Sequence, residues 1–295
     1  MPNQVFLIKK VVLKRKTNTI EMEDPSGGGK SLIPILQISE IFALEGADID
    51  GPALNLLSEK NVPVHFFDKG HFSGSWMPFI SILSGQVSLA QYSFLLDHEL
   101  RLELAKEIVR GAIRLRCMAA RKLKPSSVDL WEDRYLALMS KVYLETKKVI
   151  PEIKDLIGEL DNERRLELGM DPSSLRLLQG LAKATVIGSF AKLSLDPWVG
   201  VLPLGNRSDT CLVEDLYFLF EPLFVDLWPF EYPKDGKTLE DVPRYYRDHY
   251  RRPAASDGKR TWSLRSLPVR EGYALISHFM GESQYRSVRK VEFPQ

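Results

Sequence analysis

The pattern of apolar residues changes near residue 90, and this change constrains the fold more than any other feature of the chain. Before it, short segments such as QVFLI, KVVLKRK and NTIEME are rich in β-branched residues and alternate in part, which is typical of strands. After it, HELRLELAKEIVRGAIRLRCMAARKLK (98–124) repeats apolar residues every three to four positions, which is typical of a helix. We therefore predict an α+β protein with a small N-terminal β-sheet domain (1–88) and a larger all-helical domain (89–295).

Two more helical segments are predicted further along the chain. Residues 130–160 form the first, which Pro151 interrupts, because proline lacks the N–H that a helix interior needs. Residues 173–193 form the second, which begins after the start signal Asp171-Pro172. Residues 230–270 are rich in Pro, Gly, Asp and Arg, and we expect an extended loop region there.

The composition excludes several classes of protein. Two cysteines, Cys117 and Cys211, are too few for a disulfide framework or a cysteine-rich zinc site, and they favour a reducing, cytoplasmic compartment. No window approaches the roughly 20 apolar residues of a membrane helix, so no membrane association is expected. The net charge is +1, and any attraction to nucleic acid must therefore come from local basic patches.

The segment PSGGGKS (25–31) ends like a phosphate-binding P-loop. That motif requires a strand, a glycine-rich loop and then a helix whose N-terminus faces the phosphates. Here Asp24 stands at the first glycine position, and the following LIPILQIS is typical of a strand. We therefore predict a hairpin connection between two strands and no nucleotide site.

Three segments together resemble one protein family. They are residues 39–78, residues 89–123, and LSLDPWVGVLP (193–203) followed by LVEDLYFLFEPLFVD (212–226). In this order and spacing they resemble the CRISPR-associated adaptation integrases, the family called Cas-one. The resemblance implies a role in CRISPR adaptation, the spacer-acquisition step of antiviral defence. It also implies a homodimer that associates with a small CRISPR adaptation partner protein.

The resemblance further implies a DNA endonuclease or integrase reaction, in which a 3′-hydroxyl attacks a backbone phosphate with the help of Mg²⁺ or Mn²⁺. Family members hold the ion with a Glu, a His and an acid. At the His position this chain has Pro203, and at the acid position it has Phe218, while the neighbouring acid Asp215 remains. The Glu position falls on Gln179 in one alignment and on an upstream residue, Glu145, in another. Because Pro and Phe offer no metal-binding atom, we assign no catalytic residue, metal ligand or cofactor, and expect a dimer that is non-catalytic or altered in activity.

Two other interpretations stay open, so the sequence does not decide whether the chain is an enzyme. In one, the protein is an active Mg²⁺- or Mn²⁺-dependent endonuclease or integrase whose ligands come from other positions, for example Glu145, Glu214 and Asp215. In the other, it is a structural protein-interaction module that binds no DNA. Asp215 itself can also be a buried acid that accepts hydrogen bonds from nearby backbone.

Two basic segments are predicted to bind DNA, as duplex ends or branched molecules. The first lies within 108–124, and the second is PRYYRDHYRRP (243–253), where tyrosines alternate with arginines. Arginine binds phosphate through two parallel hydrogen bonds, and tyrosine can stack on splayed bases. His249 is expected to be exposed in the second segment. The residues expected to contact DNA are Arg110, Arg114, Arg121, Lys122, Arg244, Arg247, Arg251 and Arg252.

Overall fold

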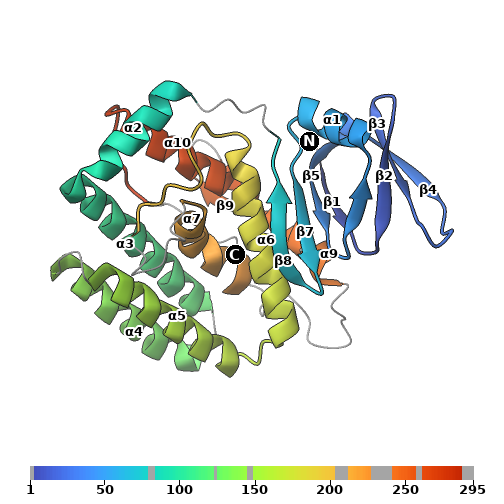
Figure 1. The fold of residues 1–295 in the computed structure, drawn as a ribbon. Coiled ribbons are helices and arrows are strands. Elements are labelled where there is room, and N and C mark those ends of the chain that lie inside the picture. The colour runs from blue at the N-terminus through green and yellow to red at the C-terminus, as the bar shows by residue number, and fades with distance from the viewer. Residues whose placement is uncertain are drawn as a thin grey trace.

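The chain changes from strands to helices where the sequence predicts it, and the α+β fold class is confirmed (Figure 1). The computed structural model describes residues 3–78, 84–122, 125–144, 149–202, 212–226, 241–256 and 261–287. The last strand of the N-terminal part ends at Trp76, and the first helix after it begins at Gly85. The division into two domains at residue 88 stays a prediction.

Two four-stranded sheets form the N-terminal part. The first has the order β1 (Asn3–Leu7), β5 (Ile38–Ala43), β7 (Val64–Asp68) and β8 (His71–Trp76), and only β8 runs antiparallel to its neighbour. The second has the order β4 (Lys30–Pro34), β3 (Thr19–Glu23), β2 (Val11–Lys16) and β6 (Ala47–Ile49). Helix α1 (Gly51–Glu59) begins at Asp50, whose side chain accepts a hydrogen bond from Ala53 N–H. Its buried Leu56 belongs to the core shared by the two sheets.

The glycine-rich segment connects β3 and β4 as an antiparallel hairpin, which confirms the prediction for PSGGGKS. Asp24 accepts a hydrogen bond from Ser26 N–H (2.8 Å) and so closes the turn. Gly27 and Gly29 have φ of 91° and 106°, a region that glycine adopts without strain. Lys30 is ion-paired with Glu21, because cross-strand neighbours on one face of a hairpin meet.

Helices dominate the chain after residue 84. They are α2 (Gly85–Leu96), α3 (His98–Lys122), α4 (Pro125–Leu144), α5 (Val149–Glu167), α6 (Pro172–Phe190), α7 (Leu212–Glu221), α9 (Val242–Tyr250) and α10 (Leu267–Phe279). A π-helical turn, Pro222–Asp226, continues α7. Helix α6 begins as predicted, because the Asp171 side chain accepts a hydrogen bond from Ser174 N–H (2.8 Å) and Pro172 occupies the first turn. Pro151 lies in the first turn of α5, so the expected interruption is the start of a new helix.

Helix α6 joins the two parts of the chain by packing on the first sheet, beside β8 (Figure 1). Gly180 makes this close approach possible, because a Cβ at this position would lie 2.8 Å from Cε1 of Phe67. Phe42 and Phe67 of the sheet belong to the same buried core as residues of α3, α5, α6 and α7. The helix α7 that carries Asp215 is therefore packed in the middle of the helical part.

Residues 230–270 differ from the expected loop region. Within the described part of this range the chain forms helix α9, a short ribbon of β9 (Pro253–Ser256) and β10 (Thr261–Ser263), and a 3₁₀ turn, Leu264–Ser266. Helix α9 forms because its apolar residues recur on one face, which is buried against the core. In the described part of the chain, no helix combines the length and the apolar character needed to cross a membrane.

Candidate functional site

Asp215 lies fully buried in the first turn of α7. Its Oδ2 accepts hydrogen bonds from the backbone N–H groups of Val201 (2.6 Å) and Leu202 (3.2 Å). Its Oδ1 has no hydrogen-bond partner among the described residues. Burial raises the pKa of Asp215 to about 6, while Lys154 and the two backbone N–H groups act to lower it. The expected bonding of this acid to nearby backbone is confirmed.

Two side chains from neighbouring helices also fix the segment 195–202. Gln91 of α2 accepts a hydrogen bond from Asp196 N–H (2.9 Å) and donates to the carbonyl oxygens of Asp196 and Val199 (3.1 Å each). Arg101 of α3 donates through Nε to the carbonyl oxygen of Val201 (2.9 Å). Asp215, Gln91 and Arg101 together satisfy the backbone of an irregular segment that lies against the core. The roles of Gln91 and Arg101 have no signal in the sequence, because their partners lie about 100 positions away along the chain.

Phe218 follows Asp215 by one helical turn and is buried. Two cations contact its ring. The Lys154 Nζ lies 5.4 Å from the ring centroid, and the Arg116 guanidinium carbon lies 4.7 Å from it. A cation over an aromatic face is attracted by the ring, with a gain of about 0.5–2 kcal/mol. The position where the resemblance places an acidic metal ligand is therefore an apolar ring beside a lysine and an arginine.

The other predicted ligand positions differ in how they are placed. Pro203 and Glu145 lie outside the described residues. Gln179 of α6 is half-buried and donates through Nε2 to Oε1 of Glu221 (3.2 Å). Glu214 is ion-paired with Lys183 of α6. The described residues contain no group of three or more His, Cys, Asp or Glu arranged to hold a metal ion. The side chains present around Phe218 do not fit a divalent cation, which prefers several oxygen ligands.

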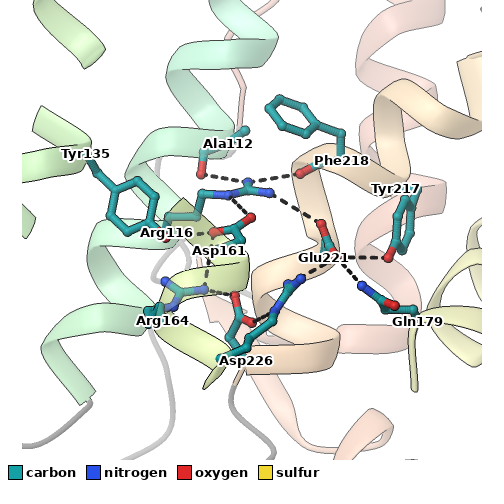
Figure 2. Close-up of polar contacts among 11 residues, drawn as sticks. Ala112, Arg116, Tyr135, Asp161, Arg164, Gln179, Tyr217, Phe218, Glu221 and Asp226 are labelled. Atoms are coloured by element: carbon teal, nitrogen blue, oxygen red, sulfur yellow. Dashed lines mark hydrogen bonds and ion pairs between the residues drawn. The ribbon is translucent and has the colours of Figure 1, made fainter. Parts of the chain in front are cut away.

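A network of buried charges lies one turn beyond Phe218 (Figure 2). Three arginines and three acids form it: Arg116, Arg164, Arg165, Asp161, Glu221 and Asp226. Arg116 donates through Nε to Asp161 (2.8 Å) and through Nη1 to the carbonyl oxygen of Phe218 (3.0 Å). Arg165 donates through Nε to Asp226 (2.7 Å). The network ties α3, α5 and α7 together, and its opposite charges are equal in number.

Uncharged side chains complete this network. Tyr135 of α4 donates its O–H to Asp161 (2.7 Å), and Tyr217 donates to Glu221 (3.0 Å). Burial opposes ionisation of Asp161, but the surrounding arginines outweigh burial and hold the pKa of its carboxyl below the ordinary value. Such a network stabilises the fold only while every charge keeps its partner. Its acids are engaged by arginines, and this makes them unsuitable as metal ligands.

The predicted DNA-binding residues of α3 are paired with acids within the chain. Arg110 and Arg114 each donate to the carboxylate of Glu107, at 3.2 and 3.1 Å. Arg121 donates to Glu132 of α4 through two nitrogens. The side chain of Lys122 lies outside the described residues. The positive charge of this segment is therefore largely balanced by acids from outside the segment.

Most of the second basic segment forms helix α9, and Arg251 and Arg252 follow its last residue. Arg244 and Arg251 are exposed, and Arg251 donates to the side chain of Asn3 (2.8 Å). Of the remaining two predicted residues, Arg247 is half-buried and donates to Asp248 (3.3 Å). Arg252 is exposed.

Two of the three tyrosines and the histidine of this segment are oriented inward, while Tyr245 is half-buried. Tyr246 and Tyr250 are buried and stacked on each other, with ring centroids 5.5 Å apart. The expected role of these two rings in stacking on bases is therefore wrong. His249 is also buried, with its Nε2 3.1 Å from the carbonyl oxygen of Leu223, so the expectation that it is exposed is wrong as well.

Comparison with known proteins gives matches over most of the chain. Residues 6–167 match the family model described as CRISPR associated protein Cas1. A relative from Moorella thermoacetica, named CRISPR-associated endonuclease Cas1 2, is 35% identical in an alignment 309 positions long, which covers 94% of this chain and 96% of the relative.

Solved structures share the fold. A Cas1 protein from Thermotoga maritima superposes with a TM-score of 0.76 at 23% identity, covering 97% of this chain and 100% of the other. A casposase bound to an integration product has a TM-score of 0.75 at 15% identity, covering 97% and 92%. One chain of a Cas6-RT-Cas1–Cas2 complex has a TM-score of 0.77 at 13% identity, covering 99% of this chain and 36% of the other.

Proposed function

The chain belongs to the Cas1 family, the integrases and endonucleases of CRISPR adaptation, and from this premise we propose that it is a DNA-binding adaptation subunit without metal-dependent catalysis at the family site. The observation that carries the proposal is Phe218, with Lys154 and Arg116 at its ring. A divalent ion at this position would lose water without gaining an oxygen ligand, and it would be repelled by two cations. Moving a polar group from water into apolar surroundings without a hydrogen-bond partner costs about 2–7 kcal/mol, and moving an ion costs more.

Asp215 does not make up for the missing ligands. One of its oxygens accepts two backbone N–H groups, and the carboxyl is fully buried. A metal ion bound by a single carboxylate keeps most of its water shell, and its affinity is low. Glu214, a second acid of the alternative ligand set, is held by Lys183. These contacts favour a non-catalytic protein over an endonuclease with ligands from other positions.

DNA binding is proposed to run mainly through the outer face of α9. Arg244 of this helix is exposed, as are Arg251 and Arg252 just after it, whereas Arg110 and Arg114 of α3 are half-buried beside Glu107 and the exposed Arg121 is paired with Glu132. The fold is compatible with this role, since a casposase of the same fold is solved with an integration product. We further propose that the chain forms a homodimer and associates with a small partner protein. A solved structure titled as a Cas6-RT-Cas1–Cas2 complex contains a chain of the same fold and supports association with a partner. Light scattering on the chain alone would show a mass near 34 kDa if the dimer proposal is wrong.

The test is an assay for binding and for strand transfer with the full chain. Labelled blunt and branched duplexes are incubated in Mg²⁺ or Mn²⁺, with the Moorella thermoacetica relative assayed in parallel. We expect salt-dependent retardation of both duplexes and no cleaved or joined product. Mn²⁺-dependent product that EDTA abolishes would refute the non-catalytic assignment. Absence of retardation at about 50 mM salt would instead support a protein-interaction module.

A further inference from the structure

Lys154 lies beside Phe218 and is none of the ligand positions that the resemblance implies. It lies near the start of α5 and is half-buried, with Nζ 5.4 Å from the Phe218 ring. No acid of the described residues forms an ion pair with it, although most charged side chains in this part of the fold are paired. Its ammonium group therefore keeps hydrogen-bond donors that no carboxylate of the described chain uses.

The charges around Lys154 explain why a cation is stable there. Asp215 brings a carboxylate into the core, and its Oδ1 has no hydrogen-bond partner in the described part of the chain. Lys154 acts electrostatically on this carboxyl, in the direction that favours its charged form. The Phe218 ring offers the ammonium group a second attraction through its face. Acid, ring and lysine form a site that holds one positive charge in place.

We propose that Lys154 takes the place of a divalent ion and binds a phosphate of DNA directly, so that this site accepts a phosphodiester without metal. In a metal-dependent site the ion neutralises the acids and attracts the phosphate. Here the lysine performs both tasks with a charge that is covalently part of the chain. A lysine binds phosphate as a point charge and needs no bidentate geometry. The inference rests on the proposed DNA binding and adds the residue and the ligand class.

The first measurement compares DNA affinity in EDTA and in Mg²⁺ over 50–200 mM KCl, by fluorescence anisotropy with a branched duplex. The wild-type chain is expected to bind no more tightly in Mg²⁺ than in EDTA, because Mg²⁺ competes with cationic side chains for DNA phosphates. Lys154→Gln should bind more weakly, because it makes about one phosphate contact fewer. Raising KCl from 50 to 200 mM should therefore weaken its binding by a factor about 3.5-fold smaller than the factor for wild type. Lys154→Arg keeps the positive charge and should retain the wild-type salt dependence.

Lys141→Gln is the matched control, because Lys141 is an exposed lysine on α4. It should leave both affinity and salt dependence unchanged, and thermal unfolding of each variant verifies that it is folded. If Lys154→Gln matches wild type while wild type binds DNA, the inference is overturned and the proposed function stands. If wild type binds no DNA, both fail. Tighter binding in Mg²⁺ than in EDTA would also overturn a metal-free phosphate site.

Discussion

Replacing Asp226 by Asn should destabilise the protein strongly, because the buried network around it is balanced in charge. Asp226 is buried and accepts hydrogen bonds from Arg164 and from Arg165 Nε (2.7 Å). Asn keeps one acceptor oxygen, but its amide nitrogen then faces a guanidinium that also donates. The lost charge-assisted bond is worth about 1.5–3 kcal/mol. The substitution also leaves three buried cations opposite two anions.

Together these effects predict a loss of about 3–5 kcal/mol in the free energy of unfolding, which is the range for breaking a buried ion pair. For a chain of 295 residues the entropy of unfolding converts this loss into a fall in Tm of about 5–8 °C. Calorimetry and urea denaturation give the two quantities. Asp248→Asn is the control, because Asp248 is exposed and pairs with Arg247 on the surface. It should cost less than about 1 kcal/mol.

A double-mutant cycle separates charge balance from lost packing. Arg165→Met removes a buried cation next to Asp226. If unbalanced charge causes the loss, the double variant should be more stable than the sum of the two single losses predicts, by about 1 kcal/mol or more. A shift in Tm below about 1 °C for Asp226→Asn, or strictly additive losses, would refute the reasoning.

Three further predictions follow from single positions. Asp215→Asn should flatten the pH dependence of the urea midpoint between about pH 4 and 6. The pKa of the Asp215 carboxyl is raised to about 6 in the fold, so this group stabilises the folded protein at low pH and loses that contribution as pH rises. The total loss in the free energy of unfolding is about 3 kcal/mol. Gly180→Ala should lower the free energy of unfolding by about 1–3 kcal/mol through the clash with Phe67, whereas Gly158→Ala, which meets no atom within 4 Å, should raise Tm slightly. Arg244→Gln should reduce the slope of log affinity against log salt concentration by about one. Arg110 is paired with Glu107, so an equal effect of Arg110→Gln would contradict the assignment of the DNA surface to α9.

The sequence predicts those parts of the fold that depend on neighbours along the chain. The hairpin after Glu23 follows from glycines and a turn-forming Asp, and the start of α6 follows from Asp171-Pro172. The burial of Tyr246 and Tyr250 was also readable, because Val242, Tyr246 and Tyr250 recur at helical spacing. The prediction of a loop over residues 230–270 did not take this helical spacing into account.

The rest depends on contacts between distant segments. Nothing near Lys154 in the sequence indicates that it lies against Phe218, because the packing of α5 on α7 brings them together. The arginines of α3 look unpaired within their own segment, yet Glu132 comes from the next helix. Glu107 lies just before the basic segment 108–124, which contains no acid, and helical spacing of three and seven places it beside Arg110 and Arg114. The pairing of Arg121 therefore depends on a tertiary contact, whereas the pairing of Arg110 and Arg114 follows from helical spacing within α3.

The cations beside Phe218 also bear on how this protein can evolve. A single substitution that returned an acid to position 218 would place the new carboxylate between Lys154 and Arg116, where it would form ion pairs. The acid would then be unavailable to a metal, and selection for catalysis would gain nothing from it. Lys154 has to change as well before a ligand at position 218 is useful. A metal site at position 218 would therefore need at least two coordinated substitutions, because an acid introduced alone would be neutralised by the neighbouring cations.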